Sequence, residues 1–360
     1  MSYTNGLDNP ELYFQTKLYT GNGSTQSITL DGDEDMQPDW VWIKSRGDTS
    51  NHRVYDSVRG ATKVIYSNLT NVEGTDSNGV TAFNSDGFSL GNEGQSNGSG
   101  VNFASWNWKA GTSFTNDASA TGIGTIDSTG SVNTTAGFSI VSYTGNGTSG
   151  TEVAHGLGST PDMYITKNRS YSSGYSWGVY HKDIADNKGL FLDLTSASTT
   201  GTGFRDSTAP TSSVFTLGGG SQPYRYTSNK SSDTYIGYFF KSVQGYSKFG
   251  SYTGNGNADG TFVYTGFNPA FVIIKRTDTT SEWHMIDNKR NTFNTVDKVL
   301  SPNTSGAEAT TGSNPIDFLS NGFKTRGSGT QVNASGGTYI YMAFAENPFV
   351  TSSGVPATAR

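Results

Sequence analysis

A pattern that occurs three times constrains this chain more than any other feature. Each copy opens with Tyr-Thr-Gly-Asn-Gly, at Tyr19, Tyr143 and Tyr252. A proline follows 17–19 residues later, and a lysine that ends a short apolar run comes six residues after it. The prolines and lysines are Pro38 with Lys44, Pro161 with Lys167, and Pro269 with Lys275. This regularity predicts the same local structure three times.

The distance between copies indicates what kind of unit is repeated. The starts lie 124 and then 109 residues apart, which exceeds the periods of solenoids and propellers and suits a small domain. A second apolar run closes each copy, over residues 103–108, 235–240 and 339–344. We therefore predict three tandem copies of one antiparallel β-domain.

These landmarks divide the chain into six parts. We predict an N-terminal segment over 1–16, a first repeat over 17–110, a linker over 111–137, a second repeat over 138–245, a third repeat over 246–346 and a tail over 347–360. Asn9 and Pro10 are typical of a helix start, and we expect a short turn packed on the first repeat, with a docking peptide as the alternative. In the linker, residues 124–126 could pair with 131–133 as a small hairpin.

Composition supports an all-β protein. Aromatic residues make up 12% of the chain, and 46 glycines accompany many Ser, Thr and Asn residues between short apolar runs. Strong β-formers separated by turn residues favour strands. The net charge of −6 without a basic cluster argues against nucleic acid and anionic membranes as partners. No apolar run approaches the roughly 20 residues of a membrane span, and residues 1–9 lack the features of a secretory signal, so we expect synthesis in a cytoplasm.

The closing runs show which side chains share a face. Alternate residues in each run are apolar and should point into the core of their own repeat. They are Ala104, Trp106 and Trp108, then Ile236, Tyr238 and Phe240, then Ile340, Met342 and Phe344. Trp42, Ile165 and Ile273 should likewise occupy equivalent positions in the three repeats.

Motifs that carry chemistry are scarce. The four histidines lie in no metalloprotease motif, and no nucleophile elbow or phosphate-binding loop occurs. Asp31, Asp33 and Asp35 alternate as at the start of a calcium loop, but Met36 replaces the required Gly and Trp42 the closing Glu. We interpret this stretch as a solvated acidic turn and expect no metal, no cofactor and no catalytic residues.

An acid and an arginine recur at one spacing. Asp56 precedes Arg59 by three residues, and Asp287 precedes Arg290 in the same way. The second repeat has His181 and Ile184 there. We predict ion pairs at strand ends in two of the three repeats.

The second repeat carries tyrosines that have no counterpart in the other two. Tyr171 and Tyr175 lie in one polar stretch, and Tyr224 and Tyr226 lie in another. Loop aromatics beside Ser and Gly suit recognition, because Tyr offers contact area at low entropic cost; ordinary loop packing is the alternative. We name these four residues as candidate glycan- or receptor-binding residues.

The second repeat also carries a resemblance to a known group of proteins. The run over 137–147, the turn His155-Gly156-Leu157-Gly158 and the pair Pro161-Asp162 resemble a repeat of virion surface proteins of tailed, especially marine, phages. The first and third copies look like variants of it, although the first lacks the His-Gly-Leu-Gly turn and the third has residues 266–268 there. The resemblance implies concanavalin A-like or jelly-roll β-sandwiches and no catalytic residues. The departures of the first and third copies indicate a structural role for His155.

Three hypotheses follow for function. The first is a non-enzymatic, lectin-like adhesin of a tail fibre or appendage on the virion surface, which binds a host glycan or protein receptor. The second is a structural virion protein, such as a capsid decoration, head fibre or tail adaptor. The third, a glycan-degrading tailspike, is disfavoured by the scarcity of chemical motifs. Other virion proteins are the expected partners, and we expect a homo-oligomer, such as a trimer, because symmetric assemblies are the general rule.

Overall fold

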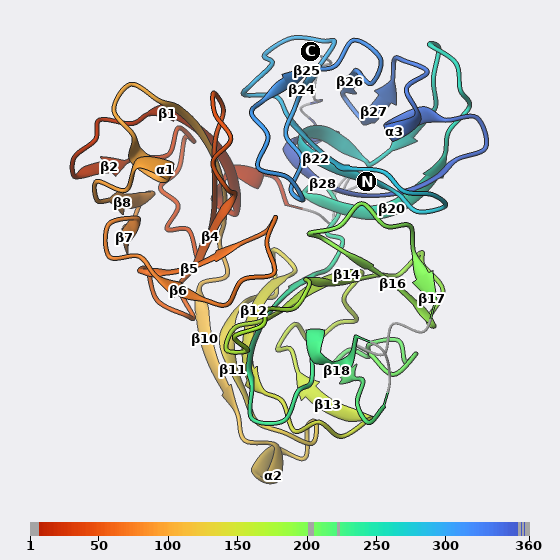
Figure 1. The fold of residues 1–360 in the computed structure, drawn as a ribbon. Coiled ribbons are helices and arrows are strands. Elements are labelled where there is room, and N and C mark those ends of the chain that lie inside the picture. The colour runs from red at the N-terminus through yellow and green to blue at the C-terminus, as the bar shows by residue number, and fades with distance from the viewer. Residues whose placement is uncertain (1–6, 201–204, 222–223, 352–353, 355, 357–360) are drawn as a thin grey trace.

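The computed structural model describes residues 7–200, 205–221, 224–351, 354 and 356. The protein is all-β, as the composition predicts, and its sheets are built from antiparallel ladders. Three lobes follow one another along the chain in Figure 1. We call them the first segment (residues 14–108), the second segment (112–240) and the third segment (247–348).

Each segment contains a larger sheet and at least one smaller sheet. In the first segment the larger sheet has the order β1-β9-β3-β4-β5-β6 and the smaller β2-β8-β7. The elements are β1 (Phe14–Thr20), β2 (Gln26–Ile28), β3 (Trp40–Ser45), β4 (Arg53–Asp56), β5 (Lys63–Tyr66), β6 (Gly74–Thr75), β7 (Val80–Phe83), β8 (Phe88–Leu90), α1 (Gly94–Asn97) and β9 (Asn102–Trp108).

The second segment has the largest sheet, with the order β10-β11-β12-β19-β14-β15-β16-β17, and a smaller pair, β13-β18. Its elements are β10 (Thr112–Asn116), α2 (Ala118–Thr121), β11 (Ser128–Asn133), β12 (Phe138–Thr144), β13 (Thr151–Ala154), β14 (Met163–Asn168), β15 (Gly178–His181), β16 (Lys188–Phe191), β17 (Thr199–Thr200), β18 (Val214–Leu217), η2 (Arg225–Thr227) and β19 (Thr234–Phe240).

The third segment has the sheets β20-β28-β22-β23, β21-β27-β26 and β24-β25. Its elements are β20 (Ser247–Thr253), β21 (Phe262–Tyr264), β22 (Phe267–Arg276), β23 (Trp283–Asp287), β24 (Lys298–Val299), β25 (Ala309–Thr310), β26 (Ile316–Leu319), β27 (Gly322–Thr325), α3 (Thr330–Asn333) and β28 (Thr338–Pro348).

The three larger sheets share a strand order. It is β1-β9-β3-β4 in the first, β12-β19-β14-β15 in the second and β20-β28-β22-β23 in the third. The register is also shared, because Trp42 lies opposite Trp106, Ile165 opposite Tyr238 and Ile273 opposite Met342. The predicted equivalence of Trp42, Ile165 and Ile273 is therefore confirmed.

A separate apolar core lies between the two layers of each segment. In the first segment Val41, Ile43 and Phe103 from the larger sheet meet Phe88 and Leu90 from the smaller one. The second and third segments have corresponding cores around Phe239 and around Phe323. Burial of these faces holds each smaller sheet onto its larger one.

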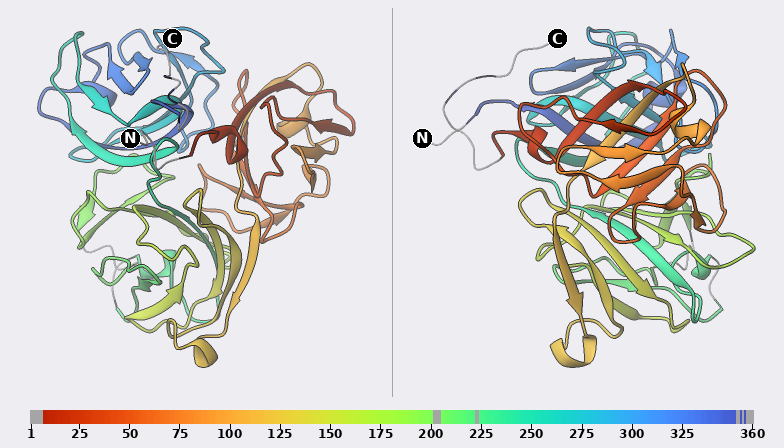
Figure 2. Two further views of the ribbon diagram at one scale, coloured as in Figure 1. Left: turned by 180° about the vertical axis from the view of Figure 1, so that it is seen from behind. Right: turned by 90° about the vertical axis from the view of Figure 1, so that its left-hand side faces the viewer.

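The other faces of the three larger sheets meet in one central core, which corrects a prediction. Trp106, Tyr238 and Met342 were expected to point into the core of their own segment. They lie instead in a single cluster to which all three segments contribute, together with Trp40, Phe240, Phe271 and Phe344. Trp40 stacks on Tyr238 with ring centres 4.6 Å apart, although the two residues belong to different segments. The segments are thus packed around a shared centre (Figure 2).

Backbone hydrogen bonds join the segments in a cycle. Glu73 N donates to Arg169 O at 3.0 Å, from the first segment to the second. Ser198 N donates to Thr277 O at 2.9 Å, from the second to the third. Glu308 N donates to Arg46 O at 2.9 Å, which returns from the third to the first. Each segment therefore contacts the next one through the same part of its structure.

Two connecting stretches differ in part from expectation. Asn9 caps a 3₁₀ helix, η1 (Pro10–Leu12), as predicted, but this stretch also contacts the connection to the third segment, where Leu7 N donates to Gln244 O. The linker does form a hairpin, yet β11 pairs with β10 and β12, while Ile126 forms a parallel bridge with Val153. The predicted pairing of 124–126 with 131–133 is wrong, because Thr125 N and Ile126 N donate instead to Glu152 O in β13.

The predicted domain boundaries can be compared with the strands only in part. β1 begins at Phe14, before the predicted boundary at residue 17, and β28 continues to Pro348, beyond the boundary at 346. Residues 1–6 of the predicted N-terminal segment, and 352–353, 355 and 357–360 of the predicted tail, lie outside the described residues.

Candidate functional site

The loop between β14 and β15 places Tyr171 beside Tyr175. Asn168, the last residue of β14, accepts hydrogen bonds on its side-chain oxygen from Ser170 N (3.0 Å) and Tyr171 N (2.9 Å). Gly174 has a φ of 71° and donates to Tyr171 O, which closes a turn. The rings of Tyr171 and Tyr175 then stack with centres 4.9 Å apart. A short turn with a glycine in the left-handed region thus builds an aromatic pair.

A second stretch, over residues 224–232, brings Tyr226 to the same place. Its ring meets Tyr175 edge to face at 5.3 Å. Tyr226 O accepts hydrogen bonds from the side-chain amide of Asn168 (3.3 Å) and from the hydroxyl of Tyr235 (3.0 Å). Asn168 therefore positions both loops, and three of the four predicted tyrosines form one cluster. We call Tyr171, Tyr175 and Tyr226 the tyrosine cluster.

Tyr224, the fourth predicted residue, lies apart from this cluster. Its backbone is left-handed, with a φ of 58°, and its ring packs against Phe191 at 4.9 Å. The residue is 49% exposed. The structure therefore does not bring Tyr224 together with the other three.

Two cations accompany the cluster, although no motif in the sequence indicates that either is a site residue. Lys230 Nζ lies 4.2 Å from the ring centre of Tyr171, and the Arg225 guanidinium lies 4.1 Å from that of Tyr226. Such contacts contribute about 0.5–1 kcal/mol at exposed sites. Burial, with the nearby Tyr171 as a second cause, raises the pKa of Tyr175 to about 12. The cluster thus presents aromatic rings, hydroxyls and positive charge.

The base of the cluster is anchored to the first segment. Lys167 is fully buried, and its ammonium donates to Tyr175 O (2.8 Å), Thr70 O (2.9 Å) and Asn168 O (3.1 Å). Burial lowers the pKa of Lys167 to about 8 because removal from water disfavours the charged form. Thr70 belongs to the first segment, so the tyrosine loop is fixed between two segments.

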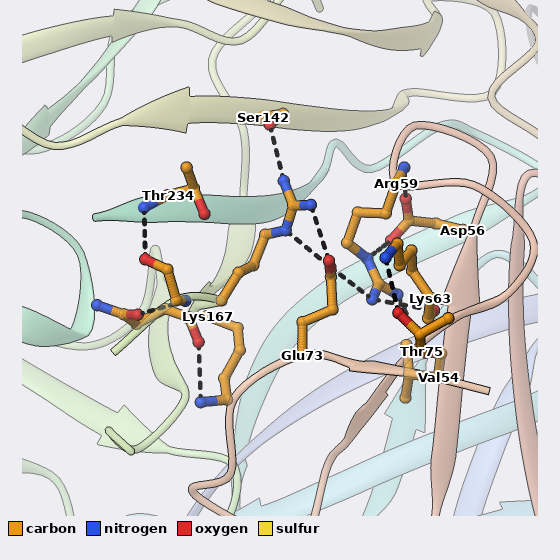
Figure 3. A network of polar contacts seen from close by, with 12 residues as sticks. Val54, Asp56, Arg59, Lys63, Glu73, Thr75, Ser142, Lys167 and Thr234 are labelled. Atoms are coloured by element: carbon orange, nitrogen blue, oxygen red, sulfur yellow. Dashed lines mark hydrogen bonds and ion pairs between the residues drawn. The ribbon is translucent and has the colours of Figure 1, made fainter. Parts of the chain in front are cut away.

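An ionic network extends this anchor (Figure 3). Arg169, next to the cluster, binds both oxygens of Glu73 at 2.8 and 3.1 Å. Glu73 also contacts Arg59 at 3.3 Å, and Arg59 Nε binds Asp56 at 2.5 Å. Asp56 in turn accepts a hydrogen bond from the Tyr238 hydroxyl of the second segment at 2.7 Å. A chain of charges therefore crosses from the first segment to the second.

The predicted Asp–Arg pairs are confirmed by this network and by its counterpart. Arg290 Nε binds Asp287 at 2.5 Å, and Arg290 also contacts Glu308, which binds Arg46 of the first segment. Both Asp–Arg pairs are fully buried. The spacing in the sequence predicted each pair but gave no sign that Glu73 and Glu308 link it to another segment.

The histidines and the acidic turn have structural partners. His155 Nε2 lies 3.2 Å from Thr211 O, and its Nδ1 accepts from Leu157 N at 3.2 Å, which fits the structural role predicted from its absence in the other two copies. Burial lowers the pKa of His155, His181 and His284 to about 4. In the acidic turn Asp31 pairs with Lys17. Within the described part of the chain, no group of three or more His, Cys, Asp or Glu residues is placed to hold a metal ion.

Comparison with known proteins places the chain in a family. A family model described as "Domain of unknown function (DUF7483)" matches residues 9–348. The chain belongs to this family. The family model covers all three segments in a single match, in keeping with their shared central core. No curated protein matches the chain, and no helix in its described residues is long and apolar enough to cross a membrane.

Proposed function

We propose that this DUF7483 protein is a non-catalytic adhesin on the surface of a phage virion, as part of a tail fibre or appendage, and that it binds a host glycan or protein receptor. The observation that carries the proposal is the tyrosine cluster with its two cations. Aromatic rings can pack against sugar rings while their hydroxyls form hydrogen bonds. The assignment to a phage virion rests on the sequence resemblance alone.

The proposal includes the nature of the repeated unit. We infer that the three segments are tandem copies of one jelly-roll or concanavalin A-like β-sandwich domain. Their shared strand order and register support this inference. Only the second copy carries the tyrosine cluster, as expected if loops on a common scaffold acquire separate roles.

The proposal also includes a homo-oligomer in the virion, in which several weak sites act together. The central faces of the larger sheets are already buried within one chain. An oligomer, such as a trimer, would therefore have to use other surfaces.

A structural virion subunit without a host ligand, such as a capsid decoration, head fibre or tail adaptor, is the second candidate. The ion pairs Arg169–Glu73 and Arg46–Glu308, which join segments, favour it, since they would make one chain a rigid building block.

The test is adsorption of the purified protein to a panel of bacterial strains, measured by flow cytometry. We expect Tyr171→Ala with Tyr175→Ala to weaken adsorption about 10- to 100-fold, since the loss of two aromatic contacts removes about 1.5–3 kcal/mol. Tyr224→Ala is the matched control, because this exposed tyrosine lies outside the cluster, and it should adsorb as the wild type does. Equal adsorption by a folded double variant would remove the cluster from the site. Failure of the wild type to adsorb would favour the structural candidate.

A further inference from the structure

At the contact between the second and third segments, the residues that the structure describes do not repeat the ion pairs that join the other segments. Between the first and second segments the charges of these ion pairs come from Arg59, Glu73 and Arg169. At the contact between the second and third segments, Ile184 corresponds to Arg59 in strand register. Ser198 and Thr277 correspond to Glu73 and Arg169, because each pair forms the backbone hydrogen bond between its two segments. The backbone contact itself is retained, because Ser198 N still donates to Thr277 O at 2.9 Å. Smaller side chains thus replace three long ones while the segments stay joined.

A groove of about 570 Å³ lies at this contact, which is a usual size for a ligand site at a junction between domains. Its lining includes Ile184, Ser198 and Thr277, the three replacements just described. Ser251, which corresponds to the Ser142 that binds Arg169 in the other contact, also lines it. The groove therefore occupies the place that an ionic network fills between the first and second segments.

The lining is rich in groups that suit a sugar. Hydroxyls come from Ser198, Ser251, Thr253, Thr277 and Thr338. Apolar atoms come from Ile184, Ala185, Ala197 and Ile340. A sugar ring offers both hydroxyls for hydrogen bonding and a C–H face for apolar contact, so this mixture matches it on both counts.

The charged residues of the groove favour a ligand that carries a carboxylate. Asp183 is paired with Lys182 at 2.7 Å, and Asp278 with Arg276 at 2.9 Å, so both carboxylates are already compensated. Lys188 also lines the groove and has no carboxylate partner among the described residues. An ammonium group without a partner favours a ligand that brings a carboxylate.

We propose that the groove between the second and third segments binds an oligosaccharide that contains a uronic acid. Hydroxyls of the lining hold the sugar hydroxyls, Ala185 and Ala197, the more accessible apolar residues of the lining, contact its C–H face, and Lys188 pairs with its carboxylate. This site shares no lining residue with the tyrosine cluster. It stands on its own observations and does not require the proposed adhesin function.

The first test fills the groove with the ion pair found elsewhere in the molecule. Ser198→Glu with Thr277→Arg would recreate the Glu73–Arg169 pair, and the matching backbone contact is already in place. The probe is a galacturonic acid trisaccharide, titrated by calorimetry into the full chain. We expect the wild type to bind it and the filled variant to bind at least about tenfold more weakly, with an unfolding temperature no lower than that of the wild type. No binding by the wild type, or equal binding by a folded filled variant, would overturn the proposal.

A second variant tests the chemistry without changing the contact between segments. Lys188→Met removes the charge and keeps much of the apolar stem. We expect the wild type to prefer the galacturonic acid trisaccharide over a neutral galactose trisaccharide by about fivefold, and Lys188→Met to lose that preference. An unchanged preference in this variant would refute the role of Lys188. Tyr171→Ala with Tyr175→Ala should leave binding of the probe intact, which separates this site from the tyrosine cluster; weakened binding there would count against the groove.

Discussion

Single positions in this protein can be compared across three sites of the same molecule. Asp56, His181 and Asp287 occupy matching places at the end of β4, β15 and β23. Two of them hold a buried arginine, and the third, His181, comes shortly before Asp183 and Ile184, which line the groove. A buried charge is costly unless it is paired and hydrogen-bonded, so acid and arginine are kept or lost together at these positions.

Removal of one partner of a buried pair tests this argument. Asp56→Asn should lower the free energy of unfolding by about 3–5 kcal/mol, because Arg59 stays buried without its nearest counter-charge. Denaturant titration followed by fluorescence measures the change. Asp31→Asn is the matched control, since the Asp31 side chain is 52% exposed in its pair with Lys17, and it should cost less than about 1 kcal/mol. A loss for Asp56→Asn no larger than that of the control would show that the buried network adds little.

At the scale of elements, the smaller sheet of the first segment depends on a tight turn that leaves no space for a side chain. Gly87 precedes β8 and has a φ of 94°. A Cβ atom at this position would lie 1.9 Å from Ile28 O in β2, the strand that pairs with β8. Gly100 also has a positive φ, of 73°, but a Cβ atom there would meet no atom within 4 Å. The two glycines share backbone strain and differ in surroundings.

Alanine at these two glycines should therefore have unequal effects. Gly100→Ala should cost about 1–2 kcal/mol, from the left-handed backbone alone. Gly87→Ala should cost about 1–3 kcal/mol more, because β2 and β8 must move apart to admit the methyl group. Thermal unfolding of the two variants measures the difference. Equal losses of stability in the two variants would mean that β2 and β8 can move apart at little energetic cost.

The whole molecule is held by a core that belongs to no single segment. Phe14 and Trp108 of the first segment pack against Phe344 of the third, with ring centres 5.1 and 5.6 Å from it. Phe240 of the second segment lies 6.1 Å from the same ring. Each segment buries one face of its larger sheet in this centre. Separation of any one segment from the other two would therefore expose aromatic surface of all three segments to water.

We therefore expect the protein to unfold in one cooperative transition, although its length would allow independent domains. Trp108→Ala should lower the free energy of unfolding by about 3–5 kcal/mol, as other large deletions in cores do. The shift should affect the whole chain and not the first segment alone. Differential scanning calorimetry tests this: two or three separate transitions, of which only one moves in the variant, would contradict the shared core.

The sequence by itself determined the local structure of this protein. The spacing of turn glycines, prolines and apolar runs predicted the strands, because these are properties of short stretches of chain. Asp-x-x-Arg predicted two ion pairs for the same reason, and the tyrosines without counterparts indicated two loops, of which Tyr171, Tyr175 and Tyr226 come together.

Only the tertiary structure decided which faces meet. Trp40 and Val41 are adjacent, apolar and buried, yet one lies in the central core and the other in the core of its own segment. Alternation along a strand establishes two faces but does not assign a partner to either when both are apolar. The link from Glu73 to Arg169 and the groove at Ser198 and Thr277 join residues far apart in the chain. Such contacts depend on how three segments pack together, which no local pattern encodes.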